Sequence, residues 1–456
     1  MIVIKFGGTS VGNAERIATA IDIVASARER RPIVVVSALS GVTNDLVAAT
    51  ERASSGASDE ALTILDRVRV RHEEVGLQLV KQKSDYYDSF LAQLHKETDQ
   101  IGAILRGIAL VGDVSPRARD KIVAIGEKLS SVLFAYSVRL KTLPGVHVDS
   151  EEVIVTNDQF GGATPDMART TAAAAKVLLP EIERGHIPVL GGFIGRSTSG
   201  ATTTLGRGGS DYSAAILGAG VQAEEIQIWT DVDGMMTCDP RLIPSAKVID
   251  RISYVEAAEL AYFGAKVLHP KTIAPAVDRE IPIRVLNTHN RTSEGTLITR
   301  NGESGRVGPR AVALKRGITI VHITSDQMLG AHGFLARIFE VFDDLAIEVD
   351  LVTTSEVSVS VTVEHHEQVS ELAARLAPFA RTEVLEGQAI IAIVGRGLVA
   401  DSTLLARVFS QSLPITMLSM GTSGLNLSLV LSETDIEQSI RAIHHSIFEQ
   451  DAGTPT

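Results

Sequence analysis

The 456-residue chain lacks several features, and each absence excludes a class of protein. Its single cysteine, Cys238, permits neither an intrachain disulfide nor a zinc site built from several cysteines, which excludes a disulfide-stabilised extracellular scaffold. No apolar run reaches the ~20 residues that a membrane span needs, and the opening MIVIKFGG does not match a signal peptide. We therefore expect a cytoplasmic protein with no membrane partner.

Basic residues are also in deficit. Lys and Arg total 43 against 55 Asp and Glu, so the formal net charge is -12. Such a charge repels the phosphates of nucleic acids and argues against a nucleic-acid partner. The remaining composition, 45% hydrophobic and 21% charged, is typical of folded soluble domains, and the length accommodates about three domains of ~150 residues.

The N-terminal part predicts a mainly parallel sheet with helices on both faces. Residues 2–6 read as a buried strand, 7–12 as a loop, 13–30 as an amphipathic helix and 33–36 as a second strand. The order strand, helix, strand with short glycine-rich turns is typical of α/β domains. Further short apolar strands are expected at 187–190, 226–230 and 281–286.

We expect this α/β domain to span 1–299. It is interrupted at about 48–140 by a helical insertion, because that segment is rich in Arg, Lys, Glu, Gln and Leu with helical spacing and has no clear strand. Residues 300–310 carry three glycines, a proline and mixed charge, which is the composition of a linker between domains.

Beyond the linker the elements repeat as two small α+β units, 311–388 and 389–456. Strict alternation of valine with polar residues over 357–364 predicts a strand with one apolar and one polar face. The second unit ends in EQDAGTPT, which is too short and polar for a final strand. We therefore expect its missing edge strand to come from elsewhere in the chain or from exchange between the two units.

The N-terminal KFGGTS is the first candidate for chemistry. Lys5 stands at a strand end, and Gly7, Gly8 and Thr9 precede a helix. Such a loop lets backbone N–H groups approach phosphate oxygens while the lysine supplies charge, although the spacing is not that of a Walker A motif. The alternative is a tight turn with an incidental lysine.

In GRGGSDYSA, Arg207 could bind a carboxylate, whereas Ser210 and Asp211 could act on a ligand or only cap the following helix. The segment TDVDGMMTCDPR follows a predicted strand, so its carboxylates lie where open α/β sheets bind nucleotides. The alternative for that segment is an acidic turn at Asp233 and Gly234. Lys266 in FGAKVLHP would, taken alone, be a solvated surface lysine.

Taken in order, six segments resemble the aspartate kinases of the amino acid kinase family: KFGGTSV, SGVTND at residues 40–45, GE at 126–127, GRGGSDYSA, WTDVDGMMTCDPR and FGAKVLHPKT. TTSEVSVSV and the two C-terminal units resemble that family's tandem ACT regulatory domains. The resemblance covers essentially the whole chain. It implies an amino acid kinase fold followed by two ferredoxin-like ACT domains.

The resemblance implies phosphoryl transfer from MgATP to the side-chain carboxylate of L-aspartate, the first step of lysine, threonine and methionine biosynthesis. Lys5 and Asp211 would be catalytic. The expected aspartate-binding residues are Thr43, Glu127, Arg207 and Ser210. The expected nucleotide-binding residues are Lys5, Gly7, Gly8, Thr9, Thr230, Asp231, Met236, Arg241, Lys266 and Val267, with Met236 standing where many relatives carry tyrosine. We expect Mg²⁺ to be held mainly through ATP, with no metal site built from protein ligands.

For the C-terminal half the resemblance implies an amino acid effector. The segments MLGAHGFLARIF and VDLVTTSEVSV are similar to lysine-sensitive forms, although Ala331 replaces a serine found in some of them, so threonine remains an alternative to lysine. The residues expected near the effector are Met328, Phe334, Leu335, Val349, Asp350, Ser355 and Glu356. A homodimer or tetramer assembled through the ACT units is also implied.

Two other functions stay open from the sequence. One is another amino acid kinase, acting on glutamate, N-acetylglutamate or UMP, against which the SGVTND and FGAKVLHP segments and the C-terminal units argue. The other is a sensor that binds an amino acid without turnover. The presence of Lys5, Arg207, Asp211 and Lys266 together favours an enzyme.

Overall fold

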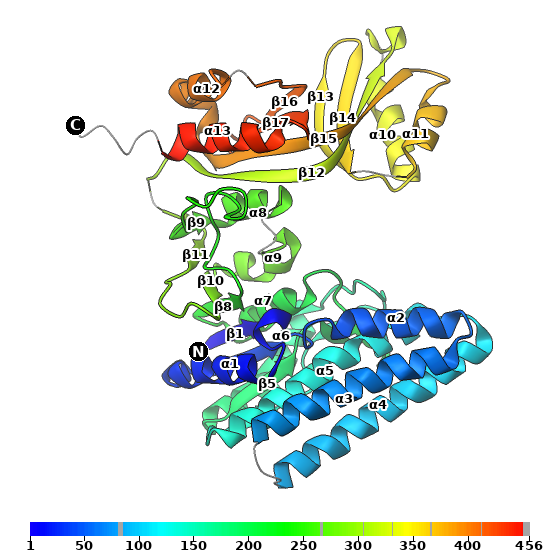
Figure 1. Ribbon diagram of the computed structural model, residues 1–456, viewed down its shortest axis with the longest axis vertical. Helices are drawn as coiled ribbons and strands as arrows, with labels where there is room; N and C mark the ends of the chain where they lie inside the picture. Colours follow the sequence, from blue (N-terminus) through cyan, green and yellow to red (C-terminus); the bar gives the residue numbers. More distant parts are fainter. Residues whose placement is uncertain are drawn as a thin grey trace. The chain divides into compact units, whose positions relative to one another are not determined.

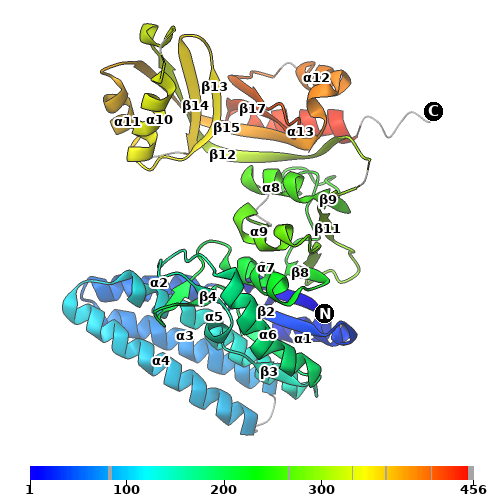
Figure 2. The ribbon, with the colours of Figure 1, turned by 180° about the vertical axis from the view of Figure 1, so that it is seen from behind.

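The computed structural model describes residues 1–80, 85–264, 268–303, 305–330, 332–364, 367–411 and 413–449. The chain forms two compact units, each drawn in Figures 1 and 2. The first unit comprises Met1–Met235, Asp250–Tyr254 and Val267–Gly302, and the second comprises Met236–Ile249, Val255–Lys266 and Glu303–Thr456. Two segments expected in the N-terminal domain, 236–249 and 255–266, therefore belong to the second unit.

An eight-stranded sheet forms the centre of the first unit. Its order is β3, β5, β2, β1, β8, β10, β11, β9, and all neighbours are parallel except β10 and β11. The mainly parallel sheet predicted from the sequence is thus confirmed. The strands are β1 (Ile2–Phe6), β2 (Pro32–Val36), β3 (Gly145–His147), β5 (Ile187–Gly191), β8 (Glu225–Thr230), β9 (Arg251–Ser253), β10 (Ile283–Asn287) and β11 (Thr296–Thr299).

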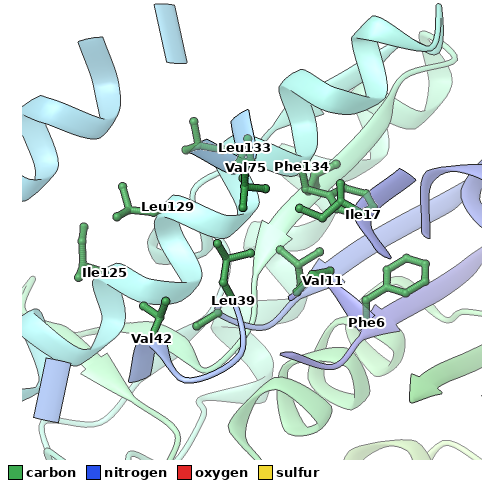
Figure 3. Packing of buried hydrophobic residues seen from close by; sticks show 14 of the residues in the cluster. Phe6, Val11, Ile17, Leu39, Val42, Val75, Ile125, Leu129, Leu133 and Phe134 are labelled. Atoms are coloured by element: carbon green, nitrogen blue, oxygen red, sulfur yellow. The ribbon is translucent and has the colours of Figure 1, made fainter. Parts of the chain in front are cut away.

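Helices cover both faces of this sheet. Side chains alternate along β1, so Ile4 and Phe6 join the hydrophobic cluster that includes Phe134 of α5 (Pro116–Leu140). Lys5 points to the opposite face and meets Asp211 of α7 (Gly209–Val221). Figure 3 shows Phe6 and Phe134 in this cluster, with their ring centroids 5.7 Å apart. The remaining helices of this unit outside the helical segment are α1 (Ala14–Ser26), α6 (Met167–Glu183), α7 (Gly209–Val221) and α9 (Pro270–Asp278).

Four long helices occupy the segment expected to be helical, and they pack side by side (Figure 1). They are α2 (Val42–Ser54), α3 (Ser58–Val80), α4 (Asp85–Val111) and α5 (Pro116–Leu140). The helical region begins at residue 42, earlier than expected, because Gly41 adopts φ +86° and starts α2 directly after the loop that follows β2. A small sheet of β4 (Val155–Thr156), β6 (Ile194–Ser197) and β7 (Thr202–Thr204) completes this unit.

The second unit contains a six-stranded sheet in the order β13, β14, β12, β15, β17, β16. Its strands are β12 (Gly308–Thr324), β13 (Val349–Thr354), β14 (Ser358–Glu364), β15 (Arg381–Arg396), β16 (Met417–Met420) and β17 (Asn426–Ser432). Helices α10 (Phe334–Asp344) and α11 (Val369–Leu376) lie at one end of the sheet, and α12 (Ser402–Phe409) and α13 (Ile436–Phe448) lie at the other (Figures 1 and 2).

Two strands run through both halves of this sheet. β12 pairs with β15 from Gly308 to Thr324, so its first half lies beside the strand that begins the second α+β unit. The prediction that this unit takes an edge strand from elsewhere is confirmed, and residues 308–315 supply it. The expected linker is consequently shorter, because β12 starts at Gly308 and the buried Arg310 contacts Glu303 and Glu256.

Helix α8 (Tyr254–Tyr262) follows β9 in the chain. Residues 265–267, which come after it in the sequence, are outside the described residues. Among the helices that the structure describes, none combines the length and apolar character required to cross a bilayer.

Candidate active site

Lys5 and Asp211 form the centre of the candidate site. Lys5 is the fourth residue of β1, its side chain is buried, and its Nζ lies 2.6 Å from Asp211 Oδ1. Asp211 is in the first turn of α7, which begins after Gly208 in the left-handed conformation at φ +68°. The strand end and the helix start therefore bring together the two residues expected to be catalytic.

A cavity of about 230 Å³ opens beside this ion pair. Five of the expected residues line it, although they are spread over more than 200 positions of the sequence. The lining residues are Lys5, Ser37, Thr43, Glu127, Phe193, Gly206, Gly208, Gly209, Ser210 and Asp211, all from the first unit.

Glu127 is the most strongly perturbed acid of this cavity. It lies on α5, its side chain is buried, and its Oε2 has no hydrogen-bond partner. Burial raises the pKa of Glu127 to about 8, although a backbone hydrogen bond near Ala38 and the Lys5 charge both act to lower it. Glu127 is thus a buried acid that would gain a cationic partner if a ligand brought an ammonium group.

Two helix starts also face the cavity. Thr43 lies in the first turn of α2 and Ser210 in the first turn of α7, and neither helix has a side-chain cap. The free N–H groups and the dipole at such ends favour negative charge. The two helix starts and Lys5 therefore suit the cavity to an anionic ligand. Glu127 suits it to a ligand that also carries an ammonium group.

Arg207 lies in the loop between two lining glycines, Gly206 and Gly208, but its own side chain is exposed and does not line the cavity. The backbone thus places Arg207 beside the cavity, but among the expected aspartate-binding residues Arg207 is the one that the cavity lining does not include. Its role as a carboxylate clamp stays a prediction.

The expected phosphate loop and the end of β8 lie at the same sheet edge. Phe6 of β1 pairs in register with Trp229 of β8, so Gly7, Gly8 and Thr9 leave the sheet beside Thr230 and Asp231. Gly7 N–H donates to Trp229 O over 3.1 Å, and Thr230 Oγ1 donates to Asp231 Oδ1 over 3.1 Å. A Cβ on Gly8 would lie only 3.0 Å from Ala38 O, which explains the glycine there.

The other nucleotide-binding residues that the resemblance implies stay predictions. Met236 and Arg241 belong to the second unit, where Arg241 donates to Asp239 Oδ2 over 2.6 Å. Lys266 and Val267 lie outside the described residues. Asp233 accepts hydrogen bonds from Asn287 and Asn290, which tie its loop to the end of β10 and the segment after it.

Sequence reasoning missed two lining residues, Ser37 and Phe193. Phe193 adopts φ +68°, an uncommon conformation for a bulky residue, and its N–H donates to Ser213 Oγ over 2.8 Å. A Cβ on Gly209 would collide with the Phe193 side chain. The one available signal was the glycine pair before Phe193 at the end of a strand, since such pairs mark close backbone approach.

The expected effector residues lie in the first half of the second unit. Met328 ends a short 3-10 helix, Phe334 and Leu335 begin α10, and the remaining residues begin β13 or follow it: Val349, Asp350, Ser355 and Glu356. Met328, Phe334 and Val349 share one hydrophobic cluster, whereas Leu335, Ser355 and Glu356 are exposed. Ala331 lies outside the described residues.

Asp350 is the most heavily contacted of these residues. Its Oδ1 lies 2.6 Å from Lys315 Nζ and accepts a hydrogen bond of 2.7 Å from Tyr262 Oη, while its buried Oδ2 has no partner. Lys315 also lies 3.0 Å from Glu364 and 5.0 Å from the centre of the Tyr262 ring. Asp350 is thus already bound by a lysine of its own chain.

Comparisons with known proteins agree with this arrangement. Residues 1–287 match the model of the amino acid kinase family, and residues 321–372 match an ACT domain. Lysine-sensitive aspartokinase 3 of Escherichia coli K12 is 37% identical over 459 residues, covering 98% of this chain and 99% of that protein. The chloroplastic aspartokinase 2 of Arabidopsis thaliana is 36% identical over 473 residues, covering 98% and 84%.

Two solved structures of E. coli aspartokinase III are also similar to this chain. One is a complex with lysine and aspartate in the T-state, and the other a complex with aspartate and ADP in the R-state. Each has a TM-score of 0.84 at 37% identity and covers 98% of this chain and 100% of that chain. The chain belongs to the amino acid kinase family and, within it, to the aspartokinases.

Proposed function

We propose that this chain transfers the terminal phosphoryl group of ATP to the side-chain carboxylate of L-aspartate, giving 4-phospho-L-aspartate. This reaction would begin the synthesis of lysine, threonine and methionine. The observation that carries the proposal is the cavity in which Lys5, Glu127 and Asp211 converge. Membership of the aspartokinases supports it, and the E. coli relative was solved with aspartate and ADP.

The chemistry explains why these residue types are needed. A free aspartate side chain has a pKa of about 3.9, so it is ionised at neutral pH and needs no general base. The obstacle is that two anions must approach each other, and positioning and charge neutralisation are the main demands of phosphoryl transfer. Lys5 would neutralise the transferring group, and Asp211, 2.6 Å away, would hold its ammonium in place.

The substrate would be fixed by groups of both signs. Glu127 would pair with the amino group of aspartate, and that cation would lower the raised pKa of Glu127. Arg207 would move onto the α-carboxylate, while Thr43 and Ser210 would add hydrogen bonds from the two helix starts. Such positioning lowers the entropic cost of bringing the reacting atoms together.

ATP would lie along the edge formed by Gly7, Gly8, Thr9, Thr230 and Asp231. The family resemblance adds four further residues to this side: Met236, Arg241, Lys266 and Val267. Among the described residues, no three acidic, His or Cys side chains converge as a metal site. We propose that Mg²⁺, which spreads phosphate charge in such reactions, is held mainly by nucleotide oxygens and water.

The second unit would regulate the first in response to an end-product amino acid, with lysine favoured over threonine. The E. coli relative is named lysine-sensitive and was solved with lysine. We propose that Asp350 binds the effector's ammonium group and that the other expected effector residues surround it. Assembly into a homodimer or tetramer would use the ACT units, whose outer strands are β13 and β16. A cytoplasmic location accords with these substrates.

ADP release from MgATP, measured with L-aspartate, L-glutamate, N-acetyl-L-glutamate, UMP or no acceptor, tests the proposal. We expect release with L-aspartate alone, and hydroxylamine should trap the acyl phosphate. Release with another acceptor would overturn the assignment. Folded protein that binds ATP or lysine but releases no ADP with any acceptor would instead be a sensor. Lysine and threonine, added separately and together, then identify the effector.

A further inference from the structure

Asp120 is a buried carboxylate that none of the expected roles uses. It lies near the start of α5 and is 3% exposed. Glu127 follows it on the same helix after seven residues, which is about two turns, so both carboxylates project from similar faces of α5. Glu127 lines the cavity, whereas Asp120 does not.

The partners of Asp120 come from two distant segments of the chain, a loop at Gly161 and the end of β7 at Thr204. Gly161 N–H donates to both of its oxygens over 3.1 and 3.0 Å. Thr204 donates twice, from its N–H to Oδ2 over 2.8 Å and from its hydroxyl to Oδ1 over 3.0 Å. All three groups that face Asp120 are therefore hydrogen-bond donors: the Gly161 N–H, the Thr204 N–H and the Thr204 hydroxyl. Only a side chain with two acceptor oxygens can pair with all three.

Thr204 is the last residue of β7, directly before the loop that carries the cavity-lining glycines. The next residue, Leu205, donates its N–H to Phe193 O over 2.9 Å and so joins the loop to the cavity wall. A Cβ on Gly206 would lie 3.3 Å from Gly161 O, which shows that the two segments held by Asp120 pack against each other there.

We infer that Asp120 is a positioning residue for acceptor binding: it fixes the loop 205–209 so that Arg207 and Ser210 meet the carboxylate of the substrate. Asp120 acts through Thr204 and Gly161 and touches no reacting atom. The inference rests on the proposed aspartate kinase function for the identity of the acceptor. Its structural half, the anchoring of the loop, does not depend on that function.

The variant Asp120→Asn tests the inference, because it keeps the shape and replaces one acceptor by an NH₂ group that faces donors. We expect the KM for L-aspartate to rise about tenfold or more, since small misplacements of a binding group are costly. The kcat should change less than about threefold and the KM for ATP less than about twofold. Thr204→Val, which removes one of the three donors, should raise the KM for L-aspartate about threefold.

Hydrogen–deuterium exchange of the full chain without ligands gives a second readout. In Asp120→Asn, the amides of Gly161 and Thr204 should exchange at least about tenfold faster, because their common acceptor is weakened. Asp166→Asn is the matched control, since it makes the same chemical change where Asp166 accepts from Arg169 N–H at the start of α6. Asp166→Asn should alter neither the exchange rates of the Gly161 and Thr204 amides nor the KM for L-aspartate.

The outcomes separate the two claims. Unchanged exchange at Gly161 and Thr204 in both test variants, or a KM for L-aspartate that does not move while exchange accelerates, overturns the positioning role. If wild-type protein releases no ADP with L-aspartate, the proposed function fails, and the exchange measurement still decides whether Asp120 anchors the loop. If Asp120→Asn does not fold, Thr204→Val carries both measurements.

Discussion

Each compact unit contains a lysine–aspartate pair that is mostly shielded from solvent, and the two pairs differ in what surrounds them. Lys5 and Asp211 lie 2.6 Å apart, as do Lys315 and Asp350. The first pair lines a cavity, and Asp211 is the one described carboxylate within ion-pair distance of Lys5. The second pair is supplemented by Glu364 and Tyr262.

The electrostatics follow from these surroundings. Burial alone would lower the pKa of Lys315, but Asp350 and Glu364 raise it above its ordinary value. Burial and the hydrogen bond to Asp350 likewise raise the pKa of Tyr262. A ligand can therefore reach the Lys5 pair through the cavity, whereas an effector ammonium that reaches Asp350 must use its unpaired Oδ2 or displace Lys315. The first pair suits turnover and the second suits switching.

Removing Lys5 should give the largest effect. We expect Lys5→Ala to lower kcat by about 1000-fold, the size seen when a group that neutralises developing charge is lost. ADP release at saturating L-aspartate and ATP measures it. The exposed Lys176 on α6 supplies the control, since Lys176→Ala should leave kcat within about twofold. Full turnover by a folded Lys5→Ala protein would refute the catalytic role.

Glu127→Gln should raise the KM for L-aspartate about 100-fold, because the amide cannot pair with the substrate ammonium. The same change should stabilise the free protein at higher pH. The pKa of Glu127 is about 8 in the folded chain against an ordinary value of 4.5, so between these values the folded state holds a proton that the unfolded state has lost.

Within that window, each pH unit lowers the unfolding free energy of the wild type by up to about 1.4 kcal/mol, and Glu127→Gln escapes this loss. Urea unfolding at pH 5, 6, 7 and 8 should show that the unfolding free energy of Glu127→Gln rises relative to that of the wild type as pH rises. If the unfolding free energies of the two proteins instead change in parallel over this range, the pKa of Glu127 is not raised by folding. The basis of its proposed pairing with the substrate ammonium would then be lost.

The comparison of the two pairs also shows what a sequence can predict. The sequence places Lys5 just before one glycine-rich turn and Asp211 just after another, because the strand and the helix beside these turns are evident from periodicity. The catalytic roles of the two residues come from the family resemblance. Their meeting follows from the parallel sheet, since a strand's C-terminal end and the start of a helix lie at one edge. The Lys315 pair gave no such signal, because its partners on α8, β13 and β14 come from separate segments.

The other residues that the sequence did not predict have the same physical origin. Asp120 lies 41 residues from Gly161 and 84 from Thr204, and two of its three donors are backbone N–H groups, which leave no side-chain pattern in the sequence. Phe193 was missed because a positive φ in a bulky residue is imposed by its surroundings. The strand exchange is predicted by the sequence, but the first residues of the exchanged strand, 308–310, fall in the predicted linker because of their glycine and proline, whereas the structure buries Arg310 there.

Asp350→Asn should change regulation. If the effector ammonium binds this carboxylate, the neutral amide should raise the lysine concentration for half-inhibition by about tenfold or more, within the usual range of allosteric coupling. Inhibition curves at fixed L-aspartate measure the shift. Asp326→Asn, at the exposed end of the short helix before Met328, makes the same change outside the Lys315 pair and should leave the curve unmoved. An unshifted curve for Asp350→Asn would place the effector elsewhere.

Tyr262→Phe should have the smallest effect and distinguishes the two ways in which an effector could reach Asp350. The change removes one hydrogen bond to Oδ1 and keeps the ring beside Lys315. Losing this bond should lower the unfolding free energy by about 1 kcal/mol or less, because Tyr262 is partly exposed.

The effect of Tyr262→Phe on inhibition depends on the route. If the effector displaces Lys315, a less restrained Asp350 should bind the effector about threefold more tightly. If the effector uses the free Oδ2, the half-inhibitory lysine concentration should stay within about 1.5-fold of wild type. Weaker inhibition would contradict both routes, since it would mean that Tyr262 itself contacts the effector.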